Sequence, residues 1–64
     1  MYRAIKEKFE GIHQTNLAEE TGLAIETINR IINGKQATTK PTALVIVKTI
    51  NAKAKLEDYF EKGE

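Results

Sequence analysis

The 64-residue sequence has no cysteine and no tryptophan, and only one proline and one histidine. Without cysteine, neither a disulfide framework nor a thiolate zinc site can hold the fold together. His13 alone is too little for a histidine-based metal site, so we predict no metal and no other cofactor. An apolar core, alone or shared with a partner chain, must therefore stabilise the domain. At this length such a core leaves only about 3–5 kcal/mol.

Long apolar segments are also missing. The longest uninterrupted apolar run covers residues 43–47, whereas a bilayer-spanning helix needs about 20 residues. The first residues lack the apolar core of a secretion signal, so we expect a cytoplasmic protein with no membrane partner. We find no nucleophile–base pair and no carboxylate pair, and one small domain has little room for a substrate pocket. We therefore predict no catalytic residues and no enzymatic activity.

The net charge is only +1, but the charges are unevenly distributed. Residues 27–56 contain six basic and no acidic residues, while residues 57–64 contain four acids and one base. A basic segment within a near-neutral chain is what a one-sided phosphate-binding surface requires. The alternative is an ordinary solvated surface of mixed charge, and we expect Lys48, Lys53 and Lys55 to be solvated in either case.

Apolar residues recur at helical spacing along most of the chain, which predicts a single all-α domain over residues 1–64. Residues 43–47 are rich in β-branched side chains and could form a strand. However, Ala43, Ile46, Val47 and Ile50 fit one helical face, and Thr39 provides an N-cap. We therefore predict five short helices, at about 2–10, 14–21, 25–33, 40–50 and 53–61.

The two helices at 14–21 and 25–33 are separated by a tight turn that contains Gly22. Ala18 precedes this glycine by four residues, and a small side chain there lets the following helix cross closely. Leu17, Leu23 and Ile28 would fill the angle between the helices. This spacing is typical of a DNA-binding helix-turn-helix, here at about 14–33.

The segment 12–35 carries a longer pattern of residues at fixed spacing: Ile12, Gln14, Leu17, Ala18, Gly22, Leu23, Thr27, Ile28, Ile31, Gly34 and Lys35. This pattern resembles the Cro/C1-type (XRE-like) helix-turn-helix family, in which it reads L-T-Q-x-x-L-A-x-x-x-G-(V/L)-S-x-x-T-I-S-x-(I/L)-x-x-G-K. The similarity covers about residues 12–60. It implies a lambda-repressor-like fold that binds double-stranded DNA, with the helix at 25–33 in the major groove.

The sequence departs from the family pattern at three positions. His13 and Ala24 stand where the family prefers Ser or Thr as helix N-caps, and Thr21 replaces a common apolar residue. Each lost cap costs about 1 kcal/mol. The apolar residues of 2–10 also fit the family register only loosely.

Residues on the outward face of the helix at 25–33 are the candidates for reading bases. Arg30 can donate two hydrogen bonds to guanine, Glu26 can accept from cytosine, and Ile25 can pack on a thymine methyl group. Asn29 is short and would reach a base through water. Each has a simpler alternative: Arg30 could bind phosphate or pair with Glu26, Glu26 suits a helix N-terminus, and Ile25 could contact a protein.

Hydrogen-bond donors and positive charges around the motif predict phosphate contacts, and for Gln14 the resemblance implies the same role. Gln14 would contact phosphate and brace the second motif helix. Thr39 could serve only as an N-cap, or as both cap and contact. The full set of predicted phosphate contacts is Gln14, Thr27, Asn33, Lys35, Gln36, Thr38, Thr39 and Lys40.

The resemblance leaves two kinds of function open. The first is a transcriptional repressor of a phage or mobile element, in a bacterial or phage-infected host, which binds an operator as a homodimer. The second is an antirepressor or modulator that uses the same fold to bind another repressor protein; an antitoxin-type domain is a related possibility. Tyr59 and Phe60 are candidates for either the core or a dimer interface.

Overall fold

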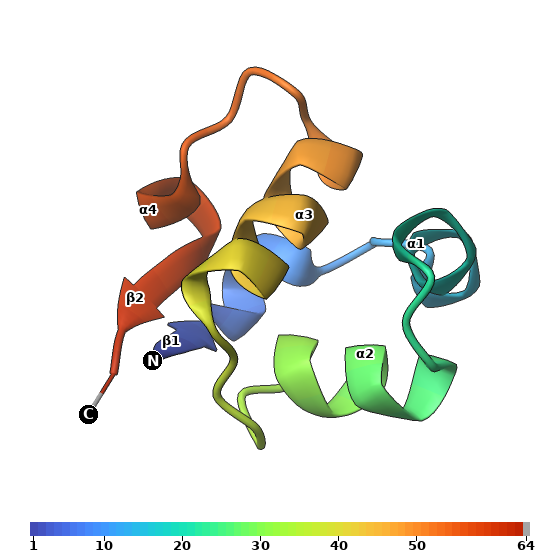
Figure 1. The fold of residues 1–64 in the computed structure, drawn as a ribbon, viewed down its shortest axis with the longest axis horizontal. Helices are drawn as coiled ribbons and strands as arrows, with labels where there is room; N and C mark the ends of the chain where they lie inside the picture. The colour runs from blue at the N-terminus through green and yellow to red at the C-terminus, as the bar shows by residue number, and fades with distance from the viewer. Residues whose placement is uncertain (64) are drawn as a thin grey trace.

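The computed structural model describes residues 1–63 (Figure 1). Over this range the chain forms four α-helices and a sheet of two short strands, together with one 3-10 turn. The elements follow one another as β1 (Tyr2–Ala4), the 3-10 turn (Lys6–Phe9), α1 (Gln14–Thr21), α2 (Ile25–Ile32), α3 (Lys40–Ile50), α4 (Leu56–Tyr59) and β2 (Phe60–Lys62).

The helix-turn-helix consists of α1 and α2, and α3 packs against α1. α1 ends at Gly22, whose φ of 79° lies in the left-handed region that glycine enters without steric cost. The Gly22 N–H donates to the carbonyl of Ala18 at 2.9 Å, which gives one of the last carbonyls of α1 a hydrogen-bond partner. The three-residue turn then starts α2 in a new direction (Figure 1). The prediction of helices at 14–21, 25–33 and 40–50 is therefore confirmed, with α2 one residue shorter than expected.

The two ends of the chain meet in the antiparallel sheet. β1 pairs with β2 in a register that sets Tyr2 opposite Lys62, Arg3 opposite Glu61 and Ala4 opposite Phe60. On its other side β1 is joined to the segment before α3, because Tyr2 and Thr38 exchange two main-chain hydrogen bonds of 2.7 Å. β1 therefore connects the C-terminal segment to the loop that follows α2.

The prediction of a helix at 2–10 is wrong. Tyr2–Ala4 is a strand, and only Lys6–Phe9 has a helical, 3-10 form. Short isolated helices are marginal in water because nucleation is costly. The strand instead gains main-chain partners on both sides, from β2 and from Thr38. Phe9, one of the residues that suggested a helix, is buried at the end of the 3-10 turn.

The predicted helix at 53–61 is also mostly wrong, because only Leu56–Tyr59 is helical. Asn51 and Asp58 fix the turn before it: the N–H of Lys53 donates to Asn51 Oδ1 at 3.0 Å, and the N–H of Lys55 donates to Asp58 Oδ2 at 3.1 Å. After one helical turn the chain becomes extended at Phe60 and pairs with β1. The all-α, five-helix prediction is thus corrected to four helices with a small sheet.

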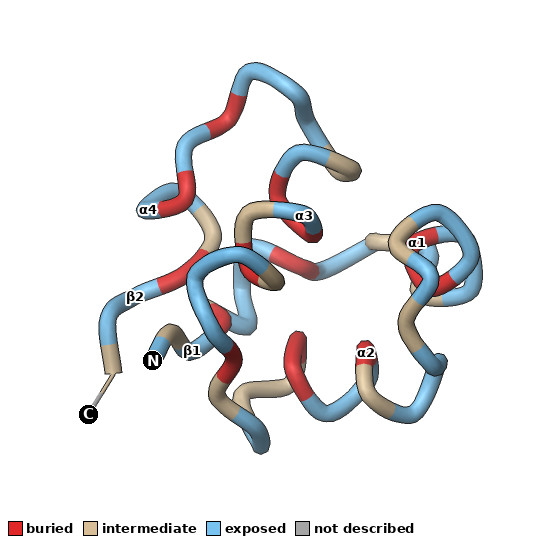
Figure 2. Tube along the Cα trace, viewed as in Figure 1, coloured by how far each residue is buried: buried red, intermediate tan, exposed pale blue. Residues whose placement is uncertain are grey.

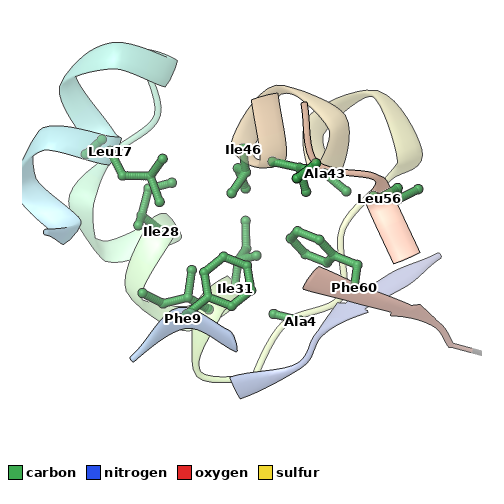
Figure 3. Packing of buried hydrophobic residues seen from close by; sticks show 13 residues of the cluster. Ala4, Phe9, Leu17, Ile28, Ile31, Ala43, Ile46, Leu56 and Phe60 are labelled. Carbon is green, nitrogen blue, oxygen red and sulfur yellow. The ribbon is translucent and has the colours of Figure 1, made fainter. Parts of the chain in front are cut away.

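The core lies between the helices and the sheet (Figures 2 and 3). Phe60, Ile31 and Ile46 point into the same interior from β2, α2 and α3 (Figure 3). The ring of Phe9 packs edge-on against that of Phe60 at 5.5 Å between centroids. The buried apolar residues are Ala4, Phe9, Leu17, Ala18, Ile28, Ile31, Ile32, Ala43, Ile46, Val47, Ala54, Leu56 and Phe60. The sheet therefore contributes to the core through both of its strands.

The start of α2 can be stabilised by one substitution. Ala24 occupies the N-cap position with extended backbone (φ −64°, ψ 144°) and has no side-chain oxygen to accept from the first turn. We expect Ala24→Ser to raise the free energy of unfolding by about 1 kcal/mol and the Tm by about 4–8 °C. Thermal unfolding followed by circular dichroism measures this change. Ala52→Ser, at an exposed site outside the helices, should leave the Tm unchanged, and an equal rise in both variants would contradict the capping explanation.

Candidate nucleic-acid interface

The outward face of α2 presents the four predicted base-reading residues together. Ile25, Glu26, Asn29 and Arg30 are all exposed and line one open hollow of about 410 Å³. The opposite face of α2 carries Ile28, Ile31 and Ile32, which are buried. This division follows from the helical repeat, which places residues three and four apart on the same side. The core thus fixes which side chains α2 turns towards solvent.

The exposed guanidinium of Arg30 has donors that can serve another molecule. Its Nε donates to the main-chain oxygen of Glu26 at 3.4 Å, which is a long hydrogen bond. The partner is the carbonyl of Glu26 and not its carboxylate, so this bond leaves the charge of the guanidinium free for other partners. Four more N–H groups of the guanidinium can serve an external acceptor.

Gln14 braces α2 against α1, as the resemblance implied. Asn29 Nδ2 donates to Gln14 Oε1 at 2.9 Å. Asn33 Nδ2 in turn donates to both Asn29 Oδ1, at 3.0 Å, and the Asn29 carbonyl, at 2.8 Å. Gln14 is at the first residue of α1 and Asn33 follows the last residue of α2. These three side chains form a hydrogen-bonded row that links the start of one motif helix to the end of the other.

The loop after α2 begins with a defined helix ending. Gly34 has a φ of 76°, its N–H donates to Ile31, and the N–H of Lys35 donates to Arg30. These two bonds form a Schellman motif, which needs a left-handed residue at the position of Gly34. Asn33, just before it, has a φ of −88°, so the left-handed residue at this helix end is Gly34. The motif directs the chain away from α2 at Lys35 and Gln36, both of which are exposed.

The other residues predicted to contact phosphate differ in how far they are exposed. Thr39 and Lys40, like Lys35 and Gln36, are exposed, whereas Thr27 and Asn33 are half-buried. Thr39 is at the N-cap of α3, but its hydroxyl bonds to the hydroxyl of Thr42 at 3.2 Å and not to a main-chain N–H. Thr38 is only 6% exposed, and its main-chain groups are engaged by Tyr2. Its proposed phosphate contact is therefore disfavoured by burial.

The two candidates for a dimer interface have different surroundings. Phe60 is 1% exposed in the core of a single chain, so its ring is not available to a second copy. Tyr59 is half-buried and packs edge-on against Phe9 at 5.4 Å between ring centroids. Of the two alternatives that we considered for Phe60, the structure selects the core.

Sequence reasoning missed Arg3. This residue lies on β1, before the motif in the sequence and outside it, yet its Nη1 donates to the carbonyl of Gly34. The bond spans 31 positions in the sequence. A helix over residues 2–10, which the periodicity predicts, does not place Arg3 beside the loop after α2. Only the strand pairing of β1 brings it there.

Over residues 1–63, none of the helices has the length and apolar composition needed to cross a bilayer. Within the same range, the structure has no cluster of three or more His, Asp or Glu side chains that could hold a metal ion.

Comparison with known protein families gives one match. A family model described as helix-turn-helix matches residues 5–54, which include α1, the turn, α2 and α3. The searches of curated proteins and of solved structures each returned no match. The family match, the packing of α1 and α2 and the solvent-facing polar surface of α2 agree with one another. The chain belongs to the Cro/C1-type (XRE-like) helix-turn-helix family of DNA-binding regulators.

Proposed function

We propose that the chain is a sequence-specific transcriptional repressor that binds an operator in double-stranded DNA through α2. The observation that carries this proposal is the grouping of Ile25, Glu26, Asn29 and Arg30 around one open hollow on α2. A helix in the major groove offers its outward side chains to base edges, where each base pair has its own pattern of donors and acceptors. These four side chains include a donor, an acceptor, an amide and an apolar group.

The exposed residues next to α2 suit contacts with the DNA backbone. Lys35, Gln36, Thr39 and Lys40 follow the recognition helix α2, and each is exposed. Contacts to phosphates fix the position and orientation of a protein on the duplex, whereas contacts to bases select the sequence. The Gln14–Asn29–Asn33 row supports the phosphate contacts and the base contacts alike, because it fixes α2 relative to the first turn of α1. Gln14 keeps its amide N–H groups for a phosphate while its oxygen accepts from Asn29.

We further propose that two copies bind one operator. Helix-turn-helix dimers read two half-sites separated by about 34–36 Å, which is one turn of DNA. Repression would follow from occupation of a promoter, and the operator would be a palindrome or near-palindrome.

Selection from a pool of randomised duplexes tests this function. The selected DNA should contain two related half-sites one turn apart, and fluorescence anisotropy should give tighter binding to it than to a scrambled duplex. The logarithm of the binding constant should fall with the logarithm of salt concentration at a slope of about −0.9 per neutralised phosphate. Failure to bind any duplex at about 50 mM salt, where charge attraction is strong, would rule out the repressor.

A protein partner is the second candidate, and the exposure of Ile25 favours it. This side chain is 40% exposed on the same surface as Glu26, whose charge repels phosphates. An antirepressor would use this surface to bind the basic DNA-reading face of another repressor. Size-exclusion chromatography with a purified repressor from the same genetic neighbourhood distinguishes the two, since an antirepressor should form a stable complex in the absence of DNA.

A further inference from the structure

We propose that Arg3, on β1, is a phosphate-contacting residue of the DNA interface. This inference deepens the proposed function and rests on it, because it adds a contact to the same interface. Arg3 lies outside the segment 5–54 that matches the helix-turn-helix family, so the family pattern assigns it no role.

Strand geometry directs Arg3 away from the core. Successive side chains of a strand point to opposite faces, and on β1 Ala4 faces the core and is buried. Arg3 is therefore on the solvent face, and it is exposed. The hydrogen bonds between Tyr2 and Thr38 hold this strand beside the segment that leads from α2 to α3.

The contact with Gly34 then fixes where the charge lies. Arg3 Nη1 donates to the carbonyl of Gly34, the residue that ends the Schellman motif of α2. The next residue, Lys35, carries an exposed positive charge. The guanidinium is thus placed at the C-terminal end of the recognition helix, next to the first of the exposed residues proposed to contact the DNA backbone.

The chemistry of the guanidinium allows both contacts together. An arginine side chain has five N–H donors, and the carbonyl of Gly34 accepts from one nitrogen. Glu61 is the cross-strand neighbour of Arg3, but the hydrogen bond of Arg3 is made to Gly34. The remaining donors form a planar fork that matches a phosphate group. Binding to Gly34 also orders the side chain beforehand, which lowers the entropic cost of the phosphate contact.

The test compares the salt dependence of DNA binding for the wild type, Arg3→Gln and Arg3→Lys. Glutamine keeps an amide donor but removes the charge, whereas lysine keeps the charge. We expect Arg3→Gln to reduce the slope by about 0.9, on a selected and on a scrambled duplex alike. If affinities coincide at about 1 M salt, this change weakens binding about eightfold at about 0.1 M. Arg3→Lys should restore the wild-type slope.

Lys8→Gln provides the matched control. Lys8 is exposed and lines a hollow with Asn51, Lys53 and Tyr59, and no residue of α2 lines this hollow. The Lys8→Gln substitution removes one positive charge, as Arg3→Gln does, and should leave the salt-dependence slope of DNA binding unchanged. An Arg3→Gln variant with the wild-type slope would show that Arg3 only clamps the end of α2, and the proposed function would stand. A wild type that binds no duplex would overturn the proposed function and this inference together.

A measurement on the wild type covers the case in which Arg3→Gln fails to fold. The chain has only two arginines, Arg3 and Arg30, so their side-chain Nε–H signals can be assigned in a nitrogen-15 NMR spectrum. We expect the Arg3 signal to shift on addition of a duplex at low salt and to return as salt is raised. An Arg3 signal that stays constant while main-chain signals of α2 move would overturn the inference.

Discussion

Phe60→Ala should leave a large fraction of the molecules unfolded at 25 °C. Phe60 is 1% exposed and packs against Phe9, with Ala4 as its cross-strand neighbour. Truncation of a buried phenylalanine to alanine costs about 3–5 kcal/mol, and the whole core of a chain this short leaves about the same amount. The folded and unfolded states would then have similar free energies. Urea denaturation of the wild type and of Phe60→Ala, followed by circular dichroism, measures the loss in free energy of unfolding.

Val45→Ala is the control for this result. Val45 is also apolar, but it is 47% exposed on α3, so its truncation should change the free energy of unfolding by less than about 0.5 kcal/mol. A folded Phe60→Ala variant with the wild-type urea midpoint would show that β2 is not part of the stable fold. The main-chain hydrogen bonds between Tyr2 and Thr38 would then be what holds β1, and with it Arg3, beside the loop after α2.

Arg30→Ala should weaken operator binding by about 1–3 kcal/mol and relax specificity at a single base pair. This side chain is exposed on α2, and its only assigned hydrogen bond in residues 1–63 is the long one to Glu26. Loss of a bidentate contact to guanine affects the selected sequence more than others. Anisotropy titrations against the selected operator and its single-base variants measure the effect.

The loss of affinity on each duplex shows whether Arg30 contacts a base or only a phosphate. An equal loss on all sequences, with a slope reduced by about 0.9, would identify Arg30 as a phosphate contact only. Lys53→Ala is the matched control, because Lys53 is exposed in the turn before α4 and should not affect the choice of sequence. If Arg30→Ala bound the operator like the wild type, the base-reading role of this residue would be excluded.

The helices at the centre of the chain could be predicted because their signals are local. Gly22 and Gly34 mark the ends of α1 and α2, and the isoleucines of α2 repeat at helical spacing. Helical periodicity in turn predicted the exposed face with Glu26, Asn29 and Arg30, because it follows once the buried face is known. The family resemblance added Ile25.

The sheet could not be predicted in this way. Its two strands have three residues each and are separated by most of the chain. The spacing of Tyr2, Ile5 and Phe9 suggests a helix, and it is the pairing with a partner distant in the sequence that makes Tyr2–Ala4 a strand. Arg3 was missed for the same reason, since its position depends on that pairing.

The outer edge of β2 is protected against association with other sheets. The main-chain N–H and C=O of Tyr2 bond to Thr38, so within β1 it is the N–H and C=O of Arg3 that face β2. Arg3 is opposite Glu61. Because these groups alternate in direction along a strand, the N–H and C=O of Lys62 point to the outer edge. A second copy that paired antiparallel with this edge would set Lys62 opposite Lys62, or Glu61 opposite Glu61. Like charges directly across a strand pair are unfavourable, and charged side chains on short edge strands discourage edge-to-edge aggregation. The charges of Glu61 and Lys62 thus disfavour antiparallel pairing of this edge with a second copy of the chain.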